Sequence, residues 1–122
     1  SHIPNYQDET YLNTRLLRWQ PETIINLPTG IGIIPFKIPG SPELMAANVE
    51  CLRRHSIVIW AKHGVMVRSD VSVERAVDLI DYAETAAKYE VLNLTTGETG
   101  EGLSAEELNA ICKTSNIKQT IF

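Results

Sequence analysis

His63 is the residue in this sequence best placed for chemistry, because of the segments on either side of it. The apolar run Ile57–Trp60 precedes it and the run Val65–Val67 follows. Both runs are too short for a free-standing helix, and the first is rich in β-branched residues, which predicts strand, tight turn and strand over residues 56–68. Gly64 would let the backbone take positive φ or pass close to a bound group. An imidazole on that turn suits metal ligation or acid–base work, with a hydrogen bond to nearby carbonyls as the alternative.

Three other residues carry chemically useful groups. Cys51 and His55 lie four residues apart on a predicted helix and therefore share a face. That spacing can hold a metal, but a site needs at least three protein ligands, so the alternative is a core cysteine and a histidine at the helix C-terminus. Glu22 is a lone acid before an apolar run. It is either a solvated carboxylate or a catalytic one.

Helices that could position these residues are indicated by caps and by apolar spacing. Pro21 is expected to end the first of them near Gln20. The long helix presents Glu90 on its solvated face with other charged residues, and its apolar stripe takes steps of three or four residues. The expected helices begin at Asn5 or Asp8, at Ser41 with Pro42, at Asp70 or Ser72, and at the capping box of Ser104. The helix that begins at Ser41 is expected to bury Met45, Val49 and Leu52. The apolar stripe of the long helix, which begins at Asp70 or Ser72, comprises Val73, Val77, Ile80, Ala83, Ala87, Val91 and Leu94.

Strands are predicted between the helices. Thr23–Leu27 has high β-propensity, and Ile31–Phe36 follows after a turn. Gly32 indicates close backbone approach or a bulge, and Pro35 indicates a strand end or an edge. Strands and amphipathic helices alternate, so the predicted fold class is α/β, with helices packed on a central sheet.

Composition restricts the classes of protein that this chain can represent. With 122 residues it is one domain by size. Its net charge of −4 carries no basic stripe, which argues against nucleic acid as a partner. No apolar run approaches the roughly 18 residues of a membrane span. The two cysteines form no CxxC pair and are expected to be free thiols in a reducing compartment. A soluble cytoplasmic domain is expected.

Two motifs resemble those of a known family. Ile38–Leu44 reads Ile-Pro-Gly-Ser-Pro-Glu-Leu, and the turn at Lys62 reads Lys-His-Gly-Val. With the long helix beginning SVERAVDLIDYAETAA, they resemble the class II aldolase/adducin superfamily. The interval from Glu22 to His63 is similar to that of its L-rhamnulose-1-phosphate aldolase branch. The resemblance implies a class II aldolase-like central β-sheet flanked by helices.

The resemblance also implies a metal-dependent aldehyde-lyase. In that branch three histidines hold Zn²⁺, which stabilises the enediolate formed when L-rhamnulose 1-phosphate is cleaved to dihydroxyacetone phosphate and L-lactaldehyde. His63 matches the third zinc histidine. Glu22 matches a catalytic acid that reaches the active site of a neighbouring subunit. The family assembles as a homotetramer with its sites at subunit interfaces.

The sequence departs from the family pattern because several of the family's active-site motifs are not found in it. The His-x-His pair, the upstream catalytic glutamate and the phosphate loops are absent. Residues 1–122 are therefore expected to be the C-terminal part of a single domain and to be inactive alone. The N-terminal half is expected to be lost or supplied by another chain. Alternatives are a fuculose-phosphate aldolase, a ribulose-phosphate epimerase or a dehydratase, and, in another class, a metal-free adducin-like interaction module.

Overall fold

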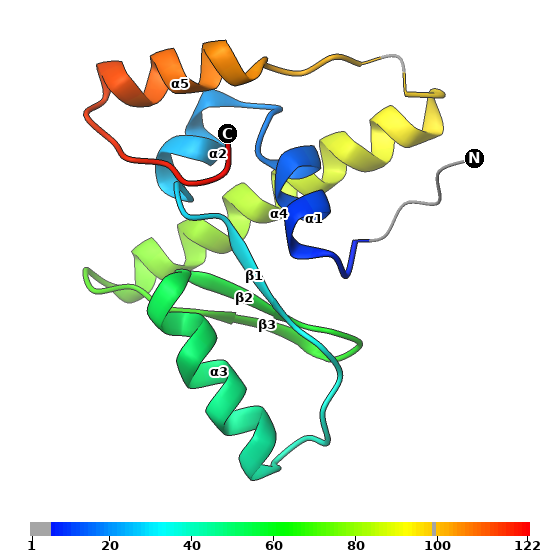
Figure 1. Ribbon diagram of the computed structural model, residues 1–122, viewed down its shortest axis with the longest axis vertical. Helices are drawn as coiled ribbons and strands as arrows, with labels where there is room; N and C mark the ends of the chain where they lie inside the picture. The colour runs from blue at the N-terminus through cyan, green and yellow to red at the C-terminus, as the bar shows by residue number, and fades with distance from the viewer. Residues whose placement is uncertain (1–5, 99) are drawn as a thin grey trace.

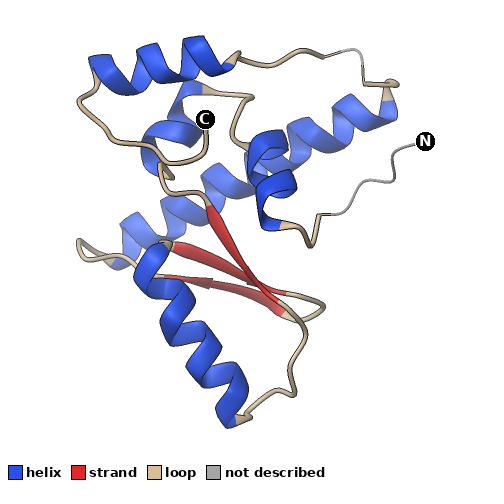
Figure 2. Cartoon of the chain, in the orientation of Figure 1, coloured by secondary structure: helices blue, strands red, loops and turns tan. Residues whose placement is uncertain are grey.

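Helices surround a small sheet in the computed structural model, which describes residues 6–98 and 100–122 (Figures 1 and 2). The predicted α/β class is confirmed. No helix in these ranges combines the length and apolar character needed to cross a membrane. The elements in chain order are α1 (Glu9–Leu16), α2 (Pro21–Asn26), β1 (Ile31–Ile34), α3 (Pro42–Arg54), β2 (Ile57–Trp60), β3 (Gly64–Val67), α4 (Val73–Thr95) and α5 (Ala105–Thr114).

The sheet has the strand order β1-β2-β3. β1 and β2 run parallel, with Ile31 opposite Ile57, because α3 carries the chain back between them. β2 and β3 form the antiparallel hairpin that the sequence predicts, with Trp60 opposite Gly64. α3 covers one face of the sheet, while α1 and α4 lie on the other side (Figure 1).

Side chains along the strands point alternately to the two faces of the sheet and so contribute to two apolar cores. Ile31 and Ile57 point into the larger core, which they share with helices α1, α2, α4 and α5. Ile34 and Val58 point to the opposite face and join Leu44 and Cys51 of α3 in a smaller core. Burial on both faces, which the continuous apolar run predicts, holds for Ile57 and Val58 of β2, whereas Ile59 and Trp60 are half-buried.

The predicted strand over Thr23–Leu27 is wrong, because the segment is helix α2. Pro21 does not end α1, which stops at Leu16; it occupies the start of α2, where its fixed φ and missing N–H suit the first helical turn. Thr23 and Ile24 are both fully buried. Burial of adjacent residues suits a helix packed against α4 and α5, and this packing overrides the β-propensity of the segment.

The caps of α3 and α4 are as predicted, but their buried faces are not. Ser41 and Ser72 are the N-caps, accepting hydrogen bonds from the N–H groups of Leu44 and Arg75. In α3 the buried residues are Leu44 and Cys51; Met45 and Val49 are exposed, and Leu52 is partly buried. In α4 the predicted stripe is half exposed, at Val73, Val77, Ala87 and Val91, whereas Leu79, Ala86, Glu90 and Asn93 are buried. The first helix is capped by Asp8; Asn5 lies outside the described residues.

Glu90 is a clear departure from the expected solvated face, since only 3% of its surface is exposed. Its Oε1 accepts a hydrogen bond from the Arg15 guanidinium at 2.8 Å, and Arg15 also pairs with Glu98. Burial opposes the charge on Arg15, but the hydrogen bonds to these two carboxylates raise its pKa. The pair joins α1 to the C-terminal part of α4, where a lone buried carboxylate would be costly.

Side chains of α1 satisfy the outer edge of β1. The Ile31 N–H donates to Asn13 Oδ1 at 2.7 Å, and Asn13 Nδ2 donates to the Ile31 carbonyl at 2.9 Å. The Ile33 N–H donates to Glu9 Oε1 at 3.0 Å. Asn13 is 1% exposed, so it takes the place of a neighbouring strand in a site closed to water.

We expect Asn13→Ala to destabilise the protein by about 1–3 kcal/mol, because the Ile31 N–H and C=O would be left buried without partners. Asn109→Ala is the matched control. Asn13 donates to the Glu9 carbonyl one turn back, and Asn109 donates to a carbonyl in the same way. Asn109 is exposed, so a change within about 0.5 kcal/mol is expected there. Chemical denaturation of both variants measures the difference. Equal stabilities would contradict the role given to Asn13.

Candidate functional site

The β2–β3 turn is built by backbone hydrogen bonds at the carboxyl end of β2. The Ala61 N–H donates to the Ile34 carbonyl at 3.0 Å, and the His63 N–H donates to the Trp60 carbonyl at 2.9 Å. Lys62 takes the left-handed conformation, with φ of 63°. His63 is therefore on a tight strand–turn–strand junction, where the sequence places it.

The positive φ considered for Gly64 is not found, while its other possible role, a close approach to a bound group, stays a prediction. The positive φ of the turn belongs to Lys62, and a Cβ added at Gly64 would meet open space. A non-glycine residue with positive φ is strained by roughly 1–3 kcal/mol, and such residues cluster at functional sites. Gly64 leaves the surface beside His63 open.

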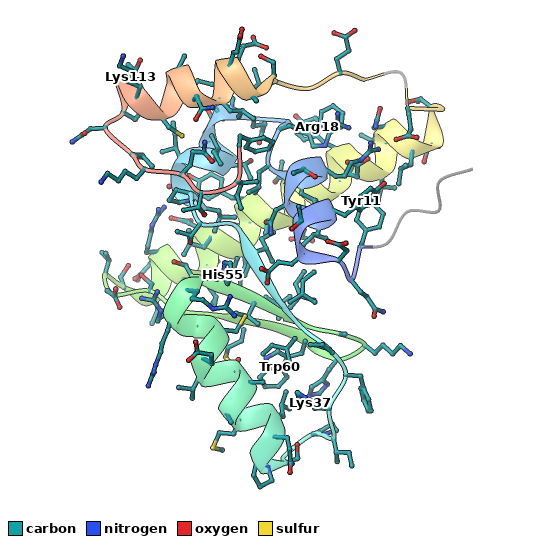
Figure 3. All side chains as sticks on the ribbon, viewed as in Figure 1. Tyr11, Arg18, Lys37, His55, Trp60 and Lys113 are labelled. Atoms are coloured by element: carbon teal, nitrogen blue, oxygen red, sulfur yellow. The ribbon has the colours of Figure 1, made fainter. Side chains whose placement is uncertain are left out.

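The His63 ring is exposed and rests on one neighbour. It stacks on the Trp60 ring, with centroids 5.2 Å apart and planes inclined by 27°. The Trp60 indole N–H donates to Asn48 Oδ1 of α3 at 2.9 Å, which fixes the surface against which His63 lies. Figure 3 shows Trp60 on the side of the sheet that faces α3. The ring nitrogens of His63 make no hydrogen bond to any described residue, so they are available to a ligand.

A pocket lies beside this turn. Its volume is about 260 Å³, and it is lined by residues of the hairpin strands and of α3 and by the two residues before α3: Trp60, Met66, Leu44, Met45, Asn48, Gly40 and Ser41. Part of the Ile-Pro-Gly-Ser-Pro-Glu-Leu motif thus meets the two strands that flank the histidine turn, although the two segments are separate in sequence.

Glu22 lies elsewhere in the chain. It is exposed in the first turn of α2, and its carboxylate makes no hydrogen bond to a described residue. Figure 1 shows α2 beside the start of β1, whereas the β2–β3 turn is at the other end of the sheet. One chain does not bring Glu22 and His63 together.

Cys51 and His55 share a face, as predicted, and Glu9 of α1 joins them. One ligand atom from each lies within 4.8 Å of the others. Cys51 and His55 are buried, and burial followed by the charge of Glu9 raises the pKa of the Cys51 thiol. Sequence reasoning missed Glu9 because it belongs to a different helix. The close approach expected at Gly32 is confirmed: a Cβ there would lie 2.4 Å from Cys51 Sγ.

Comparison with known proteins places these residues in a family. The sequence profile described as "Class II Aldolase and Adducin N-terminal domain" matches residues 10–91. A curated relative named rhamnulose-1-phosphate aldolase from Klebsiella pneumoniae (strain 342) is 35% identical over 118 residues, which are 95% of this chain and 41% of the relative. One of the same name from Yersinia pestis (strain Pestoides F) is 37% identical over 113 residues, 91% of this chain and 40% of the relative.

Solved structures agree with the sequence comparison. A sugar-phosphate aldolase from Thermotoga maritima superposes with a TM-score of 0.66 at 32% identity, over 75% of this chain and 40% of that one. A putative aldolase/epimerase/decarboxylase from Klebsiella pneumoniae, at 21% identity and a TM-score of 0.65, shares the fold. The chain spans about 40% of the length of the curated relatives described here. The match over residues 10–91 shows that the chain belongs to the Class II Aldolase and Adducin N-terminal domain family.

Proposed function

We propose that residues 1–122 form the C-terminal part of a single-domain, zinc-dependent class II aldolase. The reaction is cleavage of L-rhamnulose 1-phosphate to dihydroxyacetone phosphate and L-lactaldehyde, an aldehyde-lyase activity in the cytoplasm. The observation that carries the proposal is His63, which is exposed on the β2–β3 turn inside the family match and whose ring nitrogens make no hydrogen bond to a described residue. The names of the relatives support the choice of substrate. The two buried free cysteines are typical of a reducing compartment.

His63 suits one position of a zinc site. A neutral imidazole nitrogen is a preferred zinc ligand, and stacking on Trp60 limits its ring to few orientations. The remaining donors must come from outside the described residues, because the metal-ligating group found among them consists of Glu9, Cys51 and His55 and excludes His63. When bound, zinc supplies Lewis-acid stabilisation of the negative charge that develops as the C–C bond breaks.

Glu22 would act in trans. Its exposed carboxylate, remote from His63 within one chain, is free to enter the site of a neighbouring subunit. There it would hydrogen-bond the aldehyde oxygen of the lactaldehyde portion and exchange a proton with it as the bond breaks. In this arrangement the active site is complete only in an oligomer, for which we propose a homotetramer.

Exposed apolar surface supports assembly with further protein. A groove of about 420 Å³ between α1, the sheet and α4 is lined almost entirely by apolar side chains, and Glu84 is its single charged residue. Val65 in this groove is 52% exposed, and Val91 and Leu92 on α4 are 60% and 61% exposed. Contiguous apolar surface of this kind marks contact sites. An N-terminal half of the enzyme and neighbouring subunits are the partners that we propose for it.

The substrate is tested with a protein that also contains the segment matching the remaining length of the relatives. We expect retro-aldol cleavage of L-rhamnulose 1-phosphate, with less cleavage of L-fuculose 1-phosphate and no epimerisation of ribulose 5-phosphate, and no turnover by residues 1–122 alone. A coupled assay for dihydroxyacetone phosphate measures the cleavage of L-rhamnulose 1-phosphate and of L-fuculose 1-phosphate. Turnover confined to another sugar phosphate would favour another enzyme of the superfamily. No turnover and no bound zinc would favour an adducin-like module.

His63→Ala should remove one equivalent of zinc per chain and abolish cleavage, because the metal loses one of its ligands. The side chain is exposed, so the stability should change by no more than about 0.5 kcal/mol. Lys62→Ala, in the same turn, is the matched control and should keep the metal. Metal analysis and thermal unfolding of both variants decide the matter. Unchanged zinc content in His63→Ala would exclude His63 as a ligand.

Glu22→Gln should lower kcat by about 10²–10⁴-fold while sparing zinc content and assembly, because it removes a titrating group and keeps its shape. Glu43→Gln is the matched control, since Glu43 is also an exposed acid that follows a proline in the first turn of a helix. Steady-state cleavage kinetics compare the two variants. If both have wild-type kcat, Glu22 is a solvated carboxylate with no part in the reaction.

A further inference from the structure

Glu9, Cys51 and His55 come together where α1 and the end of α3 meet β1. Figure 3 shows His55 at the end of α3 that lies next to β1. A carboxylate oxygen, a thiol sulfur and an imidazole nitrogen are within 4.8 Å of one another. His55 is 7% exposed and Cys51 is 4% exposed. The three donor types are those that zinc takes in proteins.

The His55 ring has one nitrogen engaged and one without a partner. Nδ1 lies 2.9 Å from the Thr29 carbonyl and 3.2 Å from the Gly30 carbonyl. Carbonyl oxygens only accept hydrogen bonds, so Nδ1 must carry a proton and donate it. Nε2 is buried and has no hydrogen-bond partner. In the neutral ring Nε2 therefore presents a lone pair, the arrangement found in metal-binding histidines whose other nitrogen is tethered to a carbonyl.

The distance between His55 Nε2 and the Glu9 carboxylate is slightly longer than the distance between two ligands of one metal ion. Glu9 Oε1 is occupied by the Ile33 N–H, and Oε2 faces Nε2 at 3.7 Å. That separation is too long for a hydrogen bond, so a proton on Nε2 would not bridge the two atoms well. Two ligands bound to one tetrahedral ion at about 2.0–2.2 Å lie roughly 3.3–3.6 Å apart. The pair thus needs only a small adjustment to hold a metal.

We propose that Glu9, Cys51 and His55 form a binding site for a divalent metal ion of the zinc type. Mixed sulfur, nitrogen and oxygen donors suit zinc and cobalt better than magnesium or calcium. A carboxylate and a thiolate balance the two positive charges of the ion. Metal binding displaces the proton of the Cys51 thiol.

Gly32 of β1 makes room for this group. A Cβ there would lie 2.4 Å from Cys51 Sγ and 2.7 Å from His55 Cδ2, so a larger residue would displace both side chains. A pocket of about 460 Å³ lined by Glu9, His55 and Arg54 opens beside them. It would give the ion a route in and has room for a water molecule as a fourth ligand. A metal bound here would tie α1 to α3.

The proposed site is separate from the one at His63. It uses none of the residues assigned to the aldolase reaction, and its existence does not depend on that assignment. The two sites are distinguished by testing metal binding in the full chain carrying His63→Ala, which leaves Glu9, Cys51 and His55 unchanged.

Titration of the reduced, metal-free His63→Ala chain with Co²⁺ tests the proposal. We expect one equivalent to bind, with d–d absorption of a four-coordinate ion and a thiolate-to-cobalt charge-transfer band in the near ultraviolet. Adding Cys51→Ala should abolish the charge-transfer band and weaken binding by at least about 10–100-fold. Cys112→Ala is the matched control, since Cys112 is also a buried free thiol, and it should leave both signals unchanged.

Glu9→Gln provides a second test that keeps a carbonyl acceptor for the Ile33 N–H. It should weaken Co²⁺ binding while circular dichroism shows an unchanged fold. The proposal is overturned if the His63→Ala chain gives no charge-transfer band, if Cys51→Ala retains it, or if Cys112→Ala loses it. Those results would leave Glu9 and His55 as neighbouring side chains next to a core cysteine that bind no metal.

Discussion

The outer edge of β1 imposes the constraint on which much of this structure depends. A buried strand edge must find hydrogen-bond partners, and here side chains of a helix provide them. Asn13 pairs with both backbone groups of Ile31, and Glu9 accepts from Ile33. These contacts hold α1 against the sheet at a fixed position along β1. The position of Glu9 beside Cys51 and His55 is a result of the same contacts, so the architecture of the sheet edge also assembles the group of metal-ligating side chains.

Features decided by a few adjacent residues could be predicted from sequence. The β2–β3 hairpin, the serine caps of α3 and α4, and the capping box of Ser104 all belong to this class. Features decided by distant neighbours could not. Thr23 and Ile24 are helical because α4 and α5 bury them together, although their β-propensity favours a strand. The sequence places Glu90 on the solvated face of the long helix, yet its ion pair with Arg15 makes its burial possible.

In the candidate site, too, some features are decided by adjacent residues and others by distant neighbours. The place of His63 on a turn follows from the two apolar runs, whereas the left-handed residue is Lys62 because the hairpin register puts Gly64 opposite Trp60. Stacking of His63 on Trp60 occurs within the hairpin, whereas the bond from Trp60 to Asn48 needs α3, which packs on the face of the sheet where Trp60 lies. Cys51 and His55 share a face by helical spacing alone. Glu9 reaches them only through the fold, and no local pattern contains it.

The outer edge of β1 is closed to a further strand, so the described sheet can be extended at one edge only. Because α1 occupies that edge, an additional strand can join the described sheet only along β3, whose outer edge has no strand partner there. β3 starts at Gly64, directly after His63. A strand added by the rest of the polypeptide, or by another subunit, would therefore run beside the histidine turn rather than on the far side of the molecule. The direction in which this sheet can grow thus brings any incoming strand to the neighbourhood of His63.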